Sequence, residues 1–227
     1  MGSQLNEKAP LHALDISAST QDPSIGLVIA RAGLGKTAIL VQFALDNMLQ
    51  GNKVLHVAIG AGVEKTRTWY EDLLRTINGE DIEEIPGIMK QRMIMTFQES
   101  SFSKALLAER FNDLVDQDIF SPDCLIIDDY DFENCSRSDL EELIAFIKER
   151  NLQMAWFSAT SHREDDRKSA SGVPAPCNEI EDLFNNVLFI SPAEKEITLD
   201  ILKSDSSKVK VGTSLHLDPS TMLIKKG

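Results

Sequence analysis

Apolar residues follow two different spacings, and these alternate along most of the chain. Short apolar runs bounded by glycine or polar residues are typical of buried strands, whereas apolar positions three and four residues apart are typical of helices. This pattern predicts strands at 25–30, 53–59, 92–97, 124–127 and 152–157, and helices at 36–50, 64–77, 103–117 and 138–150. Ser138 and Glu141 are expected to form a capping box at the start of the last helix.

Strands that alternate with helices predict a parallel sheet covered by helices on both faces. The last third of the chain changes to consecutive strands, predicted at 187–190, 196–202 and 214–217 and joined by tight turns. Strands with short connections pair antiparallel. The predicted fold class is therefore α/β, with a mainly parallel sheet, helices on both faces and antiparallel C-terminal strands at one edge.

Three polar segments are expected to lie outside this core. Residues 1–22 are polar and mixed, and we interpret them as a flexible N-terminal arm before a single domain of residues 23–227. Residues 78–89 are predicted to form a polar loop. Residues 161–177 are rich in Ser, Pro and Gly, which favours a mobile loop.

The composition fits a globular domain, because 42% of the 227 residues are hydrophobic. The apolar stretches are too short to cross a bilayer, and no secretion signal is evident, so we expect a cytoplasmic protein without membrane association. Cys124, Cys135 and Cys177 form no CxxC pair. This spacing argues against a disulfide framework or a zinc site and favours reduced thiols in or near the core.

Acidic residues outnumber basic residues by 36 to 23, which gives a net charge of −13. Sequence-independent binding of nucleic acid depends on Lys and Arg side chains that neutralise phosphates. The chain has no dense run of basic residues. Nucleic acid is therefore not an expected partner.

A glycine-rich loop joins the first predicted strand to the first predicted helix. Its sequence, ARAGLGKT at residues 30–37, fits the phosphate-binding P-loop pattern with alanine in place of the first glycine. Gly33 and Gly35 allow the backbone N–H groups to curl around phosphates, and the helix adds its positive N-terminal end. Lys36 is expected to reach the β- and γ-phosphates, and the Thr37 hydroxyl to bind Mg²⁺. The alternative is a glycine-rich turn with a surface lysine. The predicted nucleotide-binding residues are Ala32, Gly33, Leu34, Gly35, Lys36, Thr37 and Ala38.

A second part of the same site is predicted from the segment CLIIDDYDF at residues 124–132. Its first four residues are apolar and lead into Asp128 and Asp129, as at the end of a buried strand. Asp128 fits the Walker B role and, with Thr37, is a predicted Mg²⁺ ligand, whereas Asp129 is placed to polarise an attacking water. The alternative is a turn in which Asp forms local hydrogen bonds.

The order of these motifs and elements resembles that of the RecA-like ATPases, particularly the DnaB and KaiC branch. The segment GLGKTAILVQFALDNMLQGNKVLHVAI is similar to the first βαβ unit of that family, and ITLDILKSDSSKVKVGTSLHLDPSTMLIKKG is similar to its closing strands. The resemblance covers about residues 24–225. It implies a RecA-like P-loop fold with ATP and Mg²⁺ as cofactors.

Two positions depart from the pattern of that family. Relatives carry a water-activating glutamate at the end of the strand after the P-loop helix, where this chain has Gly60. Glu64 lies on the following predicted helix and is a poor substitute, so Asp129 is the candidate replacement. A Lys-x-Arg triplet that reaches a neighbouring subunit's nucleotide is also common, and here it reads Lys203-Ser204-Asp205. Lys203 remains a candidate trans contact, whereas an acid in place of the arginine would repel a γ-phosphate.

The resemblance also gives a role to the strand that ends in Ser158-Ala159-Thr160. A polar residue there senses the γ-phosphate in relatives, and Thr160 is the candidate here, with a strand-end hydrogen bond as the alternative. The candidate catalytic residues are therefore Lys36, Asp129 and Thr160. The following loop is interpreted as solvated rather than partner-binding, because its charges nearly cancel: Arg163, Arg167 and Lys168 against Glu164, Asp165 and Asp166.

These features predict an ATP-binding RecA-like protein that acts as a slow ATPase or a nucleotide-dependent switch. A non-hydrolysing ATP-binding module for assembly or interaction is the alternative. A small-molecule kinase with residues 161–177 as its lid is less favoured, because a kinase lid concentrates arginines on the phosphates. ATP and ADP are the expected ligands, and a second copy of the chain or another protein remains open as a partner.

Overall fold

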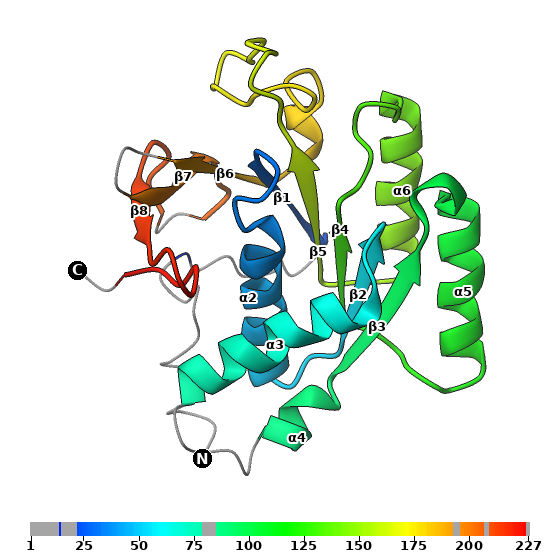
Figure 1. The fold of residues 1–227 in the computed structure, drawn as a ribbon. Helices are drawn as coiled ribbons and strands as arrows, with labels where there is room; N and C mark the ends of the chain where they lie inside the picture. Colours follow the sequence, from blue (N-terminus) through cyan, green and yellow to red (C-terminus); the bar gives the residue numbers. More distant parts are fainter. Residues whose placement is uncertain (1–13, 15–21, 79–84, 193–195, 207–208, 226–227) are drawn as a thin grey trace.

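One sheet of eight strands organises the part of the chain that the computed structural model describes, which comprises residues 14, 22–78, 85–192, 196–206 and 209–225. The strands are β1 (Ser24–Ala30), β2 (Val54–Ile59), β3 (Arg92–Phe97), β4 (Cys124–Asp128), β5 (Met154–Thr160), β6 (Asn186–Pro192), β7 (Ile197–Lys203) and β8 (Ser214–Leu217). Their order across the sheet is β3-β2-β4-β5-β1-β6-β7-β8 (Figure 1).

Helices cover both faces of this sheet (Figure 1). They are α2 (Lys36–Leu49), α3 (Val63–Asn78), α4 (Ile85–Met89), α5 (Lys104–Asp116) and α6 (Arg137–Glu149), with 3-10 turns η2 (Glu99–Ser101) and η3 (Glu181–Leu183). Helices α2 and α3 contribute to the core on one face, and α5 and α6 to the core on the other. The predicted α/β class with helices on both faces is confirmed.

The strands change from parallel to antiparallel at the point in the chain after which no described helix connects them. Strands β3, β2, β4, β5, β1 and β6 run parallel, whereas β7 and β8 continue the sheet antiparallel to their neighbours. Parallel neighbours need a long crossover, and no helix is described between β6, β7 and β8. The antiparallel C-terminal extension is therefore also confirmed.

Alternation along β1 shows how the two halves of the core are separated. Val28 and Ala30 pack in the cluster with α2 and α3, whereas Leu27 and Ile29 pack in the cluster with α5 and α6. Successive side chains of a strand point to opposite faces, so a strand covered on both faces must be apolar throughout. This explains the continuous apolar run that identified β1 in the sequence.

Two local predictions are wrong in detail. The capping box of α6 consists of Ser136 and Asp139 rather than Ser138 and Glu141, because the N-cap of the helix lies two residues earlier than the apolar pattern indicates. The predicted polar loop at 78–89 contains the short helix α4; residues 79–84 lie outside the described residues.

The second half of the predicted loop at residues 161–177 packs against the core of the protein. Val173 and Cys177 are fully buried in the cluster with α5 and α6, and the backbone forms a bridge between Lys168 and Pro174. Its basic Arg167 is paired with Asp165 at 2.6 Å. The prediction of a mobile, fully solvated loop is therefore wrong for this segment, because its apolar residues anchor it to the core.

Two further predictions concern the N-terminal arm and the cysteines. Most of residues 1–22 lie outside the described residues, but Leu14 is buried in the core with α2. All three cysteines are free thiols, and Cys124 and Cys177 are buried while Cys135 is partly exposed. The expected position in or near the core is thus confirmed for Cys124 and Cys177.

A glycine in β1 allows an aromatic stack to form behind the sheet. Gly26 is paired with Trp156 of β5, and the Trp156 ring stacks on Phe43 of α2 with 3.7 Å between ring centroids. A Cβ atom at Gly26 would lie 2.4 Å from three atoms of the Trp156 ring. Because Trp156 is fully buried, the ring has little room to move away.

We expect Gly26→Ala to lower the free energy of unfolding by about 1–3 kcal/mol, the usual cost of overpacking a core. Urea unfolding measures this difference. Gly62→Ala is the matched control, because a Cβ at Gly62 meets no heavy atom within 4 Å. Equal losses of stability in the two variants would contradict the close approach of Gly26 and Trp156.

A buried histidine in β2 makes stability depend on pH. His56 is fully buried, and its Nδ1 lies 2.9 Å from the Tyr70 hydroxyl. Burial, followed by repulsion from Arg92, lowers the pKa of His56 from 6.5 to about 3. The unfolded chain therefore takes up a proton near pH 6.5 while the folded chain stays neutral, so stability falls as the pH drops through this window.

We expect this group alone to lower the free energy of unfolding by about 1 kcal/mol between pH 7 and about pH 5.5. His56→Gln does not titrate, so the variant should be less stable at neutral pH but lose about that much less on acidification. Urea unfolding of both proteins at the two pH values gives the comparison. An unchanged pH dependence in the variant would show that His56 takes up its proton over the same pH range in the folded and the unfolded chain.

Candidate functional site

The carboxyl ends of β1, β5 and β4 lie next to one another at one edge of the sheet. The parallel register pairs Ala30 with Thr160 at the ends of β1 and β5, and Ala58 with Asp128 at the ends of β2 and β4. Ligands of open α/β sheets bind at this edge. The segments that follow these strands therefore converge on one site.

The glycine-rich loop (residues 30–37) leaves this edge and continues into α2. Gly33 and Gly35 have φ angles of 78° and 88°, which side chains with a Cβ rarely adopt. Gly35 is the N-cap of α2, and the Ile39 N–H donates to the Gly35 carbonyl at 3.2 Å. The N–H groups before Ile39 have no acceptor within the helix, so the start of α2 offers donors and partial positive charge to a ligand.

The side chain of Lys36 lies between the ends of β5 and β4. Its Nζ donates to Thr160 Oγ1 at 2.8 Å and lies 3.5 Å from Asp129 Oδ1. Only 8% of the side chain is exposed, so the ammonium group has lost most of its contact with water. The polar contacts with Thr160 and Asp129 compensate for that loss. A phosphate oxygen could join the same ammonium group from the side of the loop.

Asp128 is held by hydroxyl groups on two sides. Thr37 Oγ1 donates to Asp128 Oδ2 at 2.6 Å, and Ser158 Oγ donates to Asp128 Oδ1 at 2.6 Å. Ser158 Oγ also accepts the backbone N–H of Asp129 at 2.8 Å. Since Asp128 is only 3% exposed, these bonds fix the orientation of its carboxylate.

Asp129 has an unusual backbone and a perturbed carboxyl group. Its φ of 60° is uncommon for a residue with a side chain, and such conformations concentrate at functional sites. Burial first and the charge of Asp128 second raise the pKa of Asp129, against the opposing effect of Lys36. The side chain is half exposed and faces the lysine, where a reacting water would have access.

The structure brings together five of the predicted residues, Lys36, Thr37, Asp128, Asp129 and Thr160. The other predicted contacts would come from the backbone of the loop. Ala32 and Gly33 are exposed, whereas Leu34 packs against the core and Ala38 is buried in it. Ser158 was not predicted; the signal for it was a polar side chain two residues before Thr160, on the same face of β5.

The residues at this position suit Mg²⁺ in the presence of a nucleotide. Thr37 and Asp128 supply oxygen ligands, which Mg²⁺ prefers, and their oxygens already lie 2.6 Å apart. No group of three or more His, Cys, Asp or Glu side chains within the described part of the chain could hold a metal ion. Phosphate oxygens and water would have to complete the coordination, as is usual for Mg²⁺ at phosphate sites.

The structure shows the surroundings of Gly60, the position at which the RecA-like pattern would have a glutamate. Gly60 has a φ of 72°, and a Cβ atom there would lie 2.4 Å from Glu99 Oε1. Glutamate at Gly60, the substitution that the resemblance suggests, would therefore have a strained backbone, and the Glu99 side chain would have to move away from it.

Lys203, the last residue of β7, and Asp205, two residues later, both form hydrogen bonds within the same chain. Lys203 Nζ donates to the carbonyl of Glu181 at 3.0 Å, and Asp205 Oδ2 accepts from Asn185 at 2.6 Å. Lys203 would have to leave its bond with Glu181 to contact a neighbouring subunit. The structure thus places both residues in internal contacts.

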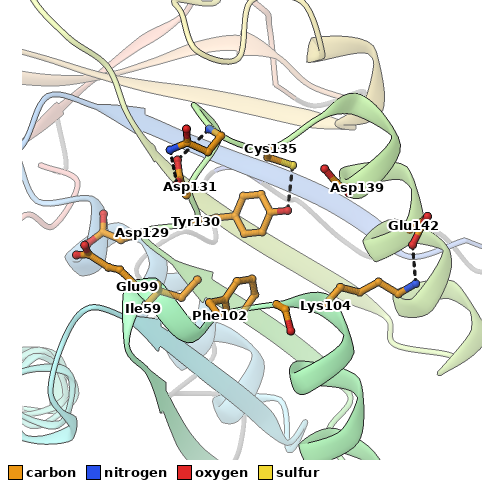
Figure 2. A pocket seen from close by; sticks show the side chains of 12 residues that line it. Ile59, Glu99, Phe102, Lys104, Asp129, Tyr130, Asp131, Cys135, Asp139 and Glu142 are labelled. Carbon is orange, nitrogen blue, oxygen red and sulfur yellow. Dashed lines mark hydrogen bonds and ion pairs between the residues drawn. The ribbon is translucent and has the colours of Figure 1, made fainter.

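A cavity of about 450 Å³ adjoins Asp129 on the side away from the glycine-rich loop (Figure 2). It lies between the ends of β2, β3 and β4 and the starts of α5 and α6. Phe102 and Tyr130 form its aromatic wall, with ring centroids 5.8 Å apart. Glu99 and Asp129 lie at one end of it.

Comparison with models of protein families and with curated proteins gives no match to this chain. Within the described residues, no helix is both long and apolar enough to cross a membrane. The function must therefore be argued from the geometry of the site.

We expect Ser158→Ala to lower the free energy of unfolding by about 1–3 kcal/mol, because it leaves an oxygen of Asp128 and the N–H of Asp129 without a buried partner. Ser101→Ala, which removes an exposed hydroxyl bonded to the Gln98 carbonyl, is the control. Chemical unfolding of both variants tests the difference. A Ser158→Ala protein as stable as the control would show that Asp128 does not depend on this hydroxyl.

Proposed function

We propose that this chain binds ATP with Mg²⁺ at the glycine-rich loop and acts as a RecA-like slow ATPase or nucleotide-dependent switch. The observation that carries the proposal is the contact of Lys36 and Thr37, at the start of α2, with Thr160 and Asp128 at two neighbouring strand ends. A surface turn with a solvated lysine would require none of these contacts. Their convergence supports a site for a phosphate group and a divalent cation.

Each side chain has a role that follows from its position. Lys36 and the first N–H groups of α2 bind phosphate oxygens, and Thr160 holds the lysine in place from the end of β5. Thr37 and Asp128 bind the cation, which neutralises part of the phosphate charge. Asp129 faces Lys36 and is the candidate to orient water near the terminal phosphate.

A non-hydrolysing ATP-binding module is the alternative, and it uses the same contacts for binding. The internal bond of Lys203 favours it, because this residue is not free in the structure to contact the nucleotide of a neighbouring copy. Turnover of ATP, measured with and without Mg²⁺, separates the two proposals. A slow but Mg²⁺-dependent rate favours the ATPase or switch.

We expect Lys36→Ala to weaken ATP binding by about 1.5–3 kcal/mol, the value of a hydrogen bond to a charged group. This corresponds to a dissociation constant roughly 10- to 150-fold higher by calorimetry in the presence of Mg²⁺. Lys148→Ala is the control, because Lys148 lies in the last turn of α6 and pairs with Asp22. Equal affinity of wild type and Lys36→Ala would show that ATP does not bind at the glycine-rich loop.

A further inference from the structure

Glu99 occupies the space beside Gly60 at the end of β2. Its Oε1 lies 2.4 Å from the position that a Cβ of Gly60 would take. The φ of 72° at Gly60 and its lack of a side chain leave this space open at the edge of the sheet. The carboxylate of Glu99, at the start of η2, thus lies where a side chain of residue 60, just after β2, would otherwise project.

The backbone around Glu99 is held in a fixed turn. Gln98 directly follows β3, and its carbonyl accepts the N–H of Ser101 at 3.0 Å and the N–H of Phe102 at 3.1 Å. The Gly60 N–H donates to the Phe97 carbonyl at 2.9 Å and so ties the end of β2 to the end of β3. The ring of Phe102 packs edge-on against Phe97 and Tyr130. These contacts hold the backbone on both sides of Glu99, whose side chain is exposed.

The other acidic side chains of the cavity have structural partners. Asp131 accepts from Asn134 within a turn, Asp139 caps α6, and Glu142 pairs with Lys104 at 2.9 Å. Glu99 forms no hydrogen bond or ion pair with any other described residue. Of these four carboxylates, it alone is left to interact with a ligand or a water.

The carboxylates of Glu99 and Asp129 lie at the same end of the cavity (Figure 2). Asp129 also contacts Lys36 of the glycine-rich loop, with 3.5 Å between Asp129 Oδ1 and Lys36 Nζ. A water held between Glu99 and Asp129 would therefore be next to the group that binds the terminal phosphate.

From this arrangement we propose that Glu99 is the water-activating residue of the site, with Asp129 orienting the same water. The proposal rests on the proposed function. In the reaction, the water oxygen attacks the γ-phosphorus of ATP while the carboxylate of Glu99 accepts a proton from that water. The bond between the γ-phosphorus and the bridging oxygen breaks, and ADP leaves with its electron pair. Glu99 then releases the proton to solvent, so ATP and water give ADP, inorganic phosphate and one proton.

The test measures ATP binding and single-turnover hydrolysis with the full chain in excess over labelled ATP and with Mg²⁺ present. Glu99→Gln keeps the size of the side chain and removes its basicity. We expect its rate to fall roughly 10²- to 10⁴-fold, the usual contribution of a general base, while the dissociation constant for ATP stays within about twofold. Glu99→Asp, with a carboxylate one methylene shorter, should recover part of the lost rate.

Glu142→Gln is the matched control from the same cavity and should hydrolyse ATP at about the wild-type rate, because Glu142 is engaged by Lys104. Wild-type turnover in Glu99→Gln, or no turnover in the wild type, would overturn the role of Glu99 but leave ATP binding intact. If Asp129→Asn lost the rate of hydrolysis while Glu99→Gln kept it, the proton transfer would be assigned to Asp129 instead. Failure of the wild type to bind ATP would instead overturn the proposed function.

Discussion

The position of β5 between β1 and β4 is the constraint on which the candidate site depends. The glycine-rich loop follows β1, and the acidic pair follows β4, so the two parts are separated by the width of one strand. The end of β5 fills this gap with two hydroxyl groups on the face that packs against α2: Thr160 contacts Lys36, and Ser158 contacts Asp128. The side chains of β5 alternate between faces, so Ser158 and Thr160 continue the face that begins with Trp156 in the core.

Packing behind the sheet supports this arrangement. Gly26 allows the Trp156 ring to lie over β1, and Phe43 stacks on that ring from α2. The same helix begins with Lys36 and Thr37, so its position on the sheet decides whether these two residues reach β5 and β4. The core and the site are thus coupled through α2, whose residues from Ala38 to Met48 are buried.

The charge balance of the site also limits what it can hold. Asp128 and Asp129 place two carboxylates side by side, Asp129 is paired with Lys36, and the chain as a whole has a net charge of −13. A nucleotide triphosphate would bring further negative charge into this region. The proposed binding of a nucleotide would therefore require a divalent cation between Asp128 and the phosphates, in addition to the donors at the start of α2. This electrostatic argument agrees with the contact between Thr37 and Asp128.

The sequence by itself determined the elements and their class. Apolar runs placed the buried strands to within three residues, because strands covered on both faces cannot include exposed polar positions. The loop pattern and the acidic strand end predicted Lys36, Thr37, Asp128 and Asp129 as site residues, and the structure brings them into contact: Thr37 with Asp128, and Lys36 with Asp129. The start of α6 was less well predicted, because its first residues, Arg137 and Ser138, are polar and only the helix cap marks the boundary.

Only the tertiary structure decided which strand ends meet. Gly60 and Glu99 follow different strands, β2 and β3, and nothing in the local sequence of either one indicates that they are in contact. Ser158 likewise gains its importance from the register of β5 beside β4, and the segment at 161–177 is anchored by Val173 and Cys177 through contacts with distant elements. Local sequence determines strands, helices and turns through short-range spacing and backbone preference. Side-chain neighbours across a sheet depend on strand order, which is set by the packing of the whole core.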